Sequence, residues 1–210
     1  MKRIKKILPY LINSLLCVAI FLIALYICDN FPFGEYTIGK SDAIVQFKPM
    51  LYNFITELKT KTIELYSFNN GLGNPFVFNF LYYLSSPLNL VAIFFKDANS
   101  MYLSVIITKL IITSIIMTFY TKKKLNNNFL TTIITLTYVF SSWFIAYYYY
   151  LPWLDIFMIF PLFNYGLEKI LNQKKPYIYI FTLAYAILTN FYLSFTIIFY
   201  TIIYFIIYEI

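Results

Sequence analysis

Long apolar stretches alternate with short polar segments along the chain. Residues 7–28, 101–120, 129–150 and 153–170 are mainly apolar, and each stretch is close to the roughly 20 helical residues that cross a hydrocarbon core. The last stretch, 177–210, is too long for one ordinary spanning helix. This pattern predicts an all-α polytopic membrane protein.

The last apolar stretch contains one polar interruption, Thr189-Asn190-Phe191-Tyr192. We predict a short outward helix before this break and a second helix that returns inward. Residues 101–210 therefore form a region of transmembrane helices. The final helix is barely complete at Ile210, so we expect the chain to be the first part of a longer protein.

The first apolar stretch follows a basic segment at residues 2–6, which predicts a cytoplasmic N-terminus. A cleaved signal peptide is the alternative interpretation. The apolar run exceeds the usual length of about 7–15 residues for such a peptide, and no A-x-A site follows it. We favour an uncleaved helix, so residues 1–28 make up the N-terminus and the first transmembrane helix.

Residues 29–100 hold most of the polar sequence and are predicted to form an extracellular loop. Within it, apolar residues recur at helical spacing over 44–65, which predicts an amphipathic helix on the membrane surface. Residues 69–75 are rich in Gly, Asn and Pro and are typical of a loop.

The apolar stretch 76–95 is interrupted by Ser85-Ser86-Pro87. If it crossed the membrane, the basic cluster Lys122-Lys123-Lys124 would lie outside, against the positive-inside rule. We therefore predict an interfacial or re-entrant element, with a full crossing as the alternative.

Composition agrees with this arrangement, since 61% of the residues are hydrophobic and 12% are charged, against about 25% charged in soluble domains. The net charge of +7 comes from clusters in short turns, which is the distribution expected of cytoplasmic loops rather than of a nucleic-acid-binding surface. The chain has no His, and both Cys lie in the first apolar stretch. These facts exclude His-ligated zinc, Ser-His-Asp triads and a disulfide framework.

The predicted topology brings Asp42, Asp155 and Asn190 to the outer face, each from a different hairpin. Such convergence is how a binding cleft between helices is built. Each residue also has a structural explanation: Asp42 as a helix N-cap, Asp155 as a first-turn acid, and Asn190 as a turn residue.

Lys109 lies in the middle of an apolar stretch, where an ionisable group is costly and should face a partner or a polar cavity. One hypothesis is contact with an anion such as a lipid phosphate. The alternatives are a structural pair with a carboxylate, or snorkelling to the interface.

Several motifs resemble those of the bacterial YfhO family, in the same order and over nearly the whole chain. They include Phe31-Pro32-Phe33-Gly34, Ser41-Asp42 with Gln46-Phe47, a glycine-rich stretch at 66–74, and Tyr82 to Leu90 with its Ser-Pro-Leu-Asn-Leu sequence. The likeness continues through Lys109, Trp153-Leu154-Asp155 and Asn190-Phe191-Tyr192.

The resemblance implies a glycosyltransferase of the GT-C class, with a GT-C-like helical bundle whose outward loop holds amphipathic interfacial helices. Such enzymes transfer a sugar from a polyprenyl-phosphate carrier on the outer face of the cell membrane. The implied acceptor is an extracellular cell-envelope polymer such as lipoteichoic acid. It also implies a chain several times longer than this one.

In the GT-C class, an acidic residue in the first outward loop acts as base or metal contact, and Asp42 stands at the matching position. Ala43 follows it, so the paired-acid form of the motif is absent; no metal site is assigned, and a divalent metal stays an open cofactor. The candidate substrate-binding residues are Lys109, Trp153, Asp155, Asn190, Gly71, Gly73 and Asn74. The departing phosphate needs a cation or dipole, which Lys109 or the Gly71–Asn74 backbone would supply, and Tyr147 to Tyr150 with Trp153 would supply faces for sugar and lipid.

Two other classes of function fit the same residues. A transporter or flippase of a lipid-linked substrate would use Lys109 as an anion site within the membrane and would not need Asp42. A non-catalytic membrane scaffold would need neither residue.

Overall fold

Helices make up most of the protein. The computed structural model describes residues 2–68 and 73–209, and it is 78% helical, with nine α-helices in that part of the chain. Four helical segments are long and apolar enough to cross a membrane: Lys6–Ile27, Ala98–Lys124, Asn128–Tyr147 and Phe191–Tyr208. The prediction of an all-α, multi-pass membrane protein is therefore confirmed.

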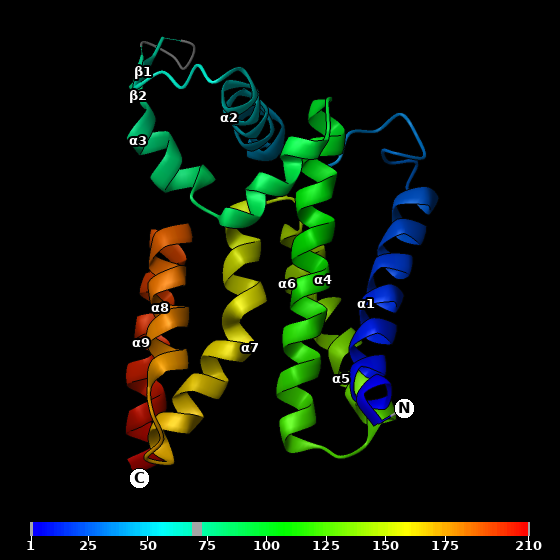
Figure 1. The fold of residues 1–210 in the computed structure, drawn as a ribbon, viewed down its shortest axis with the longest axis vertical. Coiled ribbons are helices and arrows are strands. Elements are labelled where there is room, and N and C mark those ends of the chain that lie inside the picture. The colour runs from blue at the N-terminus through cyan, green and yellow to red at the C-terminus, as the bar shows by residue number, and fades with distance from the viewer. Residues whose placement is uncertain (1, 69–72, 210) are drawn as a thin grey trace.

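Seven of the helices form a bundle (Figure 1). In chain order they are α1 (Lys2–Ile27), α4 (Ala98–Lys124), α5 (Asn128–Val139), α6 (Ser142–Tyr147), α7 (Leu151–Leu171), α8 (Tyr177–Thr189) and α9 (Phe191–Glu209). The break between α8 and α9 falls at Asn190, as the sequence predicted.

The other elements gather over the upper end of the bundle in Figure 1. They are the π-helix η1 (Ala43–Phe47), α2 (Lys48–Thr60), the strands β1 (Tyr66–Ser67) and β2 (Asn74–Pro75), α3 (Phe76–Asn79), the π-helix η2 (Phe80–Leu84) and the 3-10 helix η3 (Pro87–Phe94). The two strands pair antiparallel.

Helices α1 and α4 run in opposite directions. The Asn13 side-chain amide donates to the Thr118 hydroxyl at 2.9 Å, and the hydroxyls of Ser14 and Ser114 lie 2.8 Å apart. These pairs join the early part of α1 to the late part of α4. The segment between the two helices therefore leaves and re-enters the bundle at the same end (Figure 1).

The predicted interfacial stretch 76–95 is sharply bent. Its two apolar pieces, Phe76–Leu84 and Pro87–Phe94, meet at 94°, which is the geometry of a broken span or a re-entrant loop. Both pieces lie above α7 and α8 in Figure 1. Which of the two arrangements it takes in a bilayer stays a prediction.

The amphipathic helix predicted over 44–65 is present as η1 and α2 but ends earlier, at Thr60. Lys61 terminates it, because its backbone turns into the left-handed region at φ 57°. The Lys48 ammonium group donates to Thr37 and, at 2.7 Å, to the Asn99 side chain, which ties the first loop to the start of α4. Burial lowers the pKa of Lys48 below its ordinary value.

Polar side chains face the interior of the bundle, and many large apolar ones face outward. Buried polar residues on α4 include Lys109, Thr113, Ser114, Thr118 and Thr121. By contrast, Ile23 on α1 and Phe195, Ile203 and Ile207 on α9 are more than half exposed. This distribution suits a protein whose surroundings are lipid.

The spanning segment predicted over 129–150 is present as Asn128–Tyr147, and a short break at residues 140–141 divides it into α5 and α6. The rings of Tyr138 and Trp143 both stack on Phe157 of α7, at centroid distances of 4.6 and 4.9 Å. Residues five apart lie about 140° apart around a continuous helix, so they could not face the same ring. The break at residues 140–141 allows both contacts.

Helices α7 and α8 approach closely at Gly166. A Cβ added there would lie 2.7 Å from the Tyr179 backbone nitrogen and 2.9 Å from its Cα. Backbone atoms cannot move away as a flexible side chain can, so only glycine allows this separation.

We expect Gly166→Ala to lower the free energy of unfolding by about 1–3 kcal/mol, the usual cost of overpacking. Thermal unfolding of the detergent-purified protein measures this. Ala184→Ser, which adds one heavy atom on the exposed face of α8, is the control and should be neutral. Equal stability of both variants would contradict the close approach.

Candidate functional site

A pocket of about 490 Å³ opens at the upper end of the bundle. Four segments contribute to its wall: the first loop with η1, then η2, the start of α7, and the α8–α9 turn. The lining residues are Asp42, Gln46, Phe47, Leu81, Tyr82, Tyr83, Tyr150, Pro152, Trp153, Asn190, Phe191 and Tyr192. Three sequence-predicted residues, Asp42, Trp153 and Asn190, therefore share one pocket.

The backbone before Asp42 makes a tight turn. Gly39 has a φ of 103°, and a Cβ on it would lie 2.9 Å from the Ala43 Cβ. Ser41 also adopts the left-handed region, at φ 48°. This turn buries Ala43 and leaves the Asp42 side chain exposed at the pocket.

Asp42 does not act as a helix cap. It precedes η1, but its side chain makes no capping hydrogen bond. The hydrogen bond that its carboxylate accepts comes from the Ser41 hydroxyl at 3.4 Å. The carboxylate is therefore available to a ligand in the pocket.

Aromatic rings hold the pocket wall together. Phe47 packs edge-on against Tyr83 and Tyr150, at centroid distances of 5.0 and 5.4 Å. Tyr150 in turn stacks on Trp153 at 5.1 Å. The Tyr83 hydroxyl donates to the Gln46 side chain at 3.1 Å.

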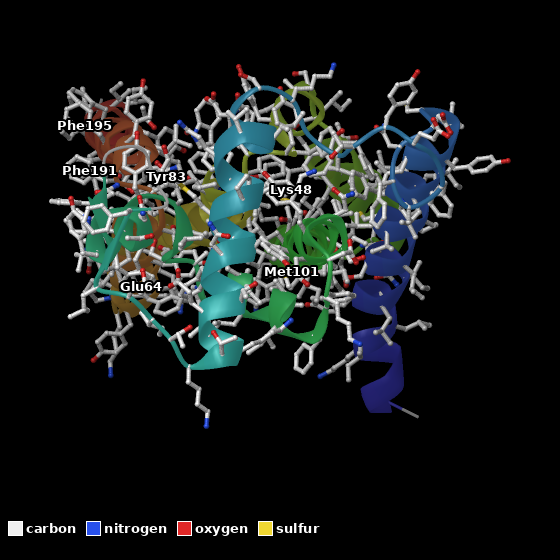
Figure 2. The ribbon with its side chains drawn as sticks, turned by 90° about the horizontal axis from the view of Figure 1, so that it is seen from above. Lys48, Glu64, Tyr83, Met101, Phe191 and Phe195 are labelled. Atoms are coloured by element: carbon white, nitrogen blue, oxygen red, sulfur yellow. The ribbon has the colours of Figure 1, made fainter. Side chains whose placement is uncertain are left out.

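Figure 2 shows the pocket end from above. Helix α2 crosses the bundle, with Tyr83 and Phe191 on one side of it and α1 on the other. Phe195 lies at the same outer edge as Phe191. The pocket thus lies toward the side of the bundle formed by α8 and α9.

Lys109 and Asp155 form a buried ion pair and are not among the pocket-lining residues. Their Nζ and Oδ2 atoms are 2.6 Å apart, and the side chains are 1% and 0% exposed. The ammonium also donates to the Leu151 carbonyl at 2.8 Å. This arrangement matches the carboxylate pairing that was one of the alternatives for Lys109.

Two further donors form hydrogen bonds with the Asp155 carboxylate. Its Oδ1 accepts hydrogen bonds from the Ser86 hydroxyl at 2.8 Å and from the Tyr185 hydroxyl at 2.7 Å. Asp155 therefore joins α4, the link between η2 and η3, and α8. Sequence reasoning singled out Asp155 and Lys109 separately, but not Ser86 or Tyr185 as partners.

Asn190 has a structural role at the pocket edge. Its Oδ1 accepts from the Leu193 amide at 2.9 Å, which caps the start of α9. The residue is 7% exposed and lines the pocket. The cap uses only the oxygen of the Asn190 side-chain amide. A structural role in the turn is therefore compatible with a ligand contact through the amide nitrogen.

The described part of the glycine-rich stretch is not among the pocket-lining residues. Gly71 falls outside the described residues. Gly73 and Asn74 belong to the β1–β2 hairpin, where Asn74 donates to the Asn79 side chain at 2.8 Å. Neither lines the pocket, so the structure does not bring them to Asp42.

Sequence reasoning did not select several pocket residues. Gln46, Tyr82 and Tyr83 were quoted among the family motifs, and that was the signal that could have marked them. Tyr185, which does not line the pocket but donates to Asp155, had no such signal, because it is one of 22 tyrosines and lies in an apolar helix.

The donor set for a metal ion is small. Within residues 2–68 and 73–209, no three His, Cys, Asp or Glu side chains lie close enough together to hold one. The pocket lining includes the single carboxylate of Asp42, beside neutral oxygens such as that of Gln46. A divalent ion prefers several oxygen ligands, so these residues fit such a site poorly.

Comparison with known families decides the relationship of the chain. The family model described as bacterial membrane protein YfhO matches residues 14–210. The chain belongs to the YfhO family. The resemblance seen in the motifs is thereby confirmed for nearly the whole sequence. No curated protein and no solved structure matches the chain, so the GT-C-like arrangement of this YfhO-family bundle stays a prediction.

We expect Lys109→Met to lower the free energy of unfolding by about 3–5 kcal/mol, because it leaves the Asp155 carboxylate buried without its cation. The double variant Lys109→Met/Asp155→Asn buries no charge and should regain most of this loss. Reversible unfolding in mixed micelles measures both.

The control breaks a second ion pair on the same two helices. Lys124 and Glu168 are 2.5 Å apart, but their side chains are 48% and 25% exposed. Lys124→Met should therefore cost no more than about 1 kcal/mol. If Lys109→Met were as stable as this control, the buried pair would not have the role assigned to it.

Proposed function

We propose that the protein is a GT-C-type glycosyltransferase that takes a sugar from a polyprenyl-phosphate carrier, with Asp42 as the catalytic base. The observation that carries this proposal is the exposed Asp42 carboxylate in a pocket otherwise lined by uncharged residues, most of them aromatic. The multi-pass fold and the family membership support a reaction at the membrane.

The chemistry needs one proton acceptor. The Asp42 carboxylate takes the proton of an acceptor hydroxyl while the hydroxyl oxygen bonds to the anomeric carbon of the donor sugar. The bond between that carbon and the phosphate oxygen breaks, and polyprenyl phosphate leaves with the electron pair. The proton, the sugar and the leaving group are then all accounted for.

Lys109 is not the group that meets the leaving phosphate in this proposal, because its ammonium is engaged by Asp155 and Leu151. Among the described residues, the pocket lining has no Lys or Arg. The starts of α7 and α9 lie at the pocket and carry the positive ends of their helix dipoles. These dipoles, with the amide of Asn190, supply the stabilisation for the phosphate.

The aromatic lining suits the other parts of the substrate. Tyr150 and Trp153 offer ring faces of the kind on which sugars pack, and their stacking keeps the rings in place. Phe191 and Phe195 are exposed at the outer edge and offer an apolar path for the lipid chain. The acceptor is proposed to be an extracellular cell-envelope polymer such as lipoteichoic acid.

The proposed orientation places the pocket on the extracellular side. The clusters Lys122–Lys124 and Lys174–Lys175 lie at the opposite, lower end of the bundle (Figure 1). By the positive-inside rule that end is cytoplasmic. A lipid transporter that uses Lys109 as its anion site is less well supported, since Lys109 faces a carboxylate rather than the pocket.

We expect Asp42→Asn in the full-length protein to lower the rate of sugar transfer by about 100-fold or more, the usual contribution of a general base. Transfer of labelled sugar from polyprenyl phosphate in isolated membranes measures the rate. Expression and membrane insertion should be unchanged, because the Asp42 side chain is exposed.

Glu35→Gln is the matched control. Glu35 is an exposed acid in the same loop but does not line the pocket, and its replacement should leave transfer intact. Normal transfer by Asp42→Asn would remove Asp42 from the mechanism. A protein that moves the carrier lipid across liposomes without altering it would instead be a transporter.

A further inference from the structure

We propose that Asp155 is a positioning residue, which fixes three walls of the pocket relative to one another through hydrogen bonds from Ser86 and Tyr185. The kinetic part of this inference rests on the proposed function. The geometric part does not, because it concerns the shape of the pocket alone.

Four elements of the fold meet at the Asp155 carboxylate. Asp155 lies on α7 and is fully buried, while its partners come from α4, from the η2–η3 link and from α8. Oδ2 takes the Lys109 ammonium, and Oδ1 takes the hydroxyls of Ser86 and Tyr185. Three donors occupy most of the roughly four lone-pair positions of a carboxylate, so the geometry is well determined.

Three of these elements also carry residues of the pocket wall or lie next to them. Pro152 and Trp153 line the pocket and precede Asp155 by one turn or less of the same helix. Tyr82 and Tyr83 line it and lie just before Ser86.

The third wall, at the α8–α9 turn, is held in the same way. Tyr185 lies one and a half turns of helix before the pocket residue Asn190. In addition, the Ser85 hydroxyl donates to the Leu188 carbonyl at 2.5 Å, which joins the η2–η3 link directly to the end of α8. Loss of the Tyr185 or Ser86 hydrogen bond therefore loosens walls that also carry the substrate contacts.

Lys109 neutralises the charge of Asp155, whereas Ser86 and Tyr185 only donate hydrogen bonds to it. The effect on stability can therefore be tested separately from the effect on positioning. Replacing Lys109 or Asp155 leaves a buried charge without its partner and disturbs folding. Tyr185→Phe and Ser86→Ala remove one donor each and keep the ion pair. These two variants are thus the ones that test positioning without unfolding the protein.

The chain offers a matched control on the same helix. Near the lower end of α7, Glu168 accepts from the Tyr120 hydroxyl at 2.8 Å and from the Lys124 ammonium at 2.5 Å. This second set of carboxylate, lysine and tyrosine lies far from the pocket. Tyr120→Phe removes the same type of hydrogen bond as Tyr185→Phe.

The experiment combines kinetics with a reporter that needs no activity. We expect Tyr185→Phe and Ser86→Ala to lower kcat by about 10- to 100-fold with KM little changed, because a small misplacement of reacting groups acts on the chemical step. Tyr120→Phe should leave kcat within about 2-fold of the parent, since no pocket wall depends on it.

The reporter is Trp153, which lines the pocket. Quenching is measured on the 210-residue chain, where Trp143→Phe leaves Trp153 as the remaining tryptophan. In that background, Tyr185→Phe should make Trp153 more accessible to acrylamide quenching, and Tyr120→Phe should not. If Tyr185→Phe and Tyr120→Phe gave the same quenching and the same kcat, the positioning role would be overturned. If Asp42→Asn were active but the quenching still differed, the proposed reaction would fail while the positioning role held.

Discussion

The structure depends on the pairing of a lysine and an aspartate in the interior of a membrane bundle. A charge in such a place is costly unless an opposite charge and further hydrogen bonds satisfy it. Once α4 carries Lys109 inward, α7 has to present a carboxylate at the same depth, and Asp155 does so. The remaining lone pairs of that carboxylate then need donors, which brings in the η2–η3 link and α8. One electrostatic requirement thereby sets the register of four segments.

Elsewhere in the interior, uncharged polar side chains also join helices through hydrogen bonds. Asn13 on α1 donates to Thr118 on α4 and accepts from Thr132 on α5 at 2.8 Å, so one amide joins three helices. Hydroxyl and amide groups can associate helices in lipid, where hydrophobic burial gives little driving force. Such uncharged groups join α1, α4 and α5, whereas the buried ion pair joins α4 and α7.

Local pattern was enough to predict the helices. Apolar length located the spans, and the polar residue Asn190 located the last break, because both signals act over a few neighbouring residues. The break between α5 and α6 was not predictable, since the ring contacts of Tyr138 and Trp143 on either side of it are made with Phe157 on another helix. The candidate site likewise has a part that the sequence predicted and a part that it did not. Topology suggested that Asp42, Asp155 and Asn190 share one end, and of these Asp42 and Asn190 line the pocket. Nothing local could pair Lys109 with Asp155, a residue 46 positions away.

The short length of helix α8 affects how it fits the surrounding lipid. Its 13 residues rise about 20 Å, less than the roughly 30 Å of a hydrocarbon core. The tops of α8 and α9 accordingly lie lower than that of α4 in Figure 1. Hydrophobic mismatch of this kind is relieved by local thinning of the bilayer. If α8 crosses the bilayer, such thinning would bring lipid headgroups at the α8–α9 turn closer to the mouth of the pocket, which that turn helps to line.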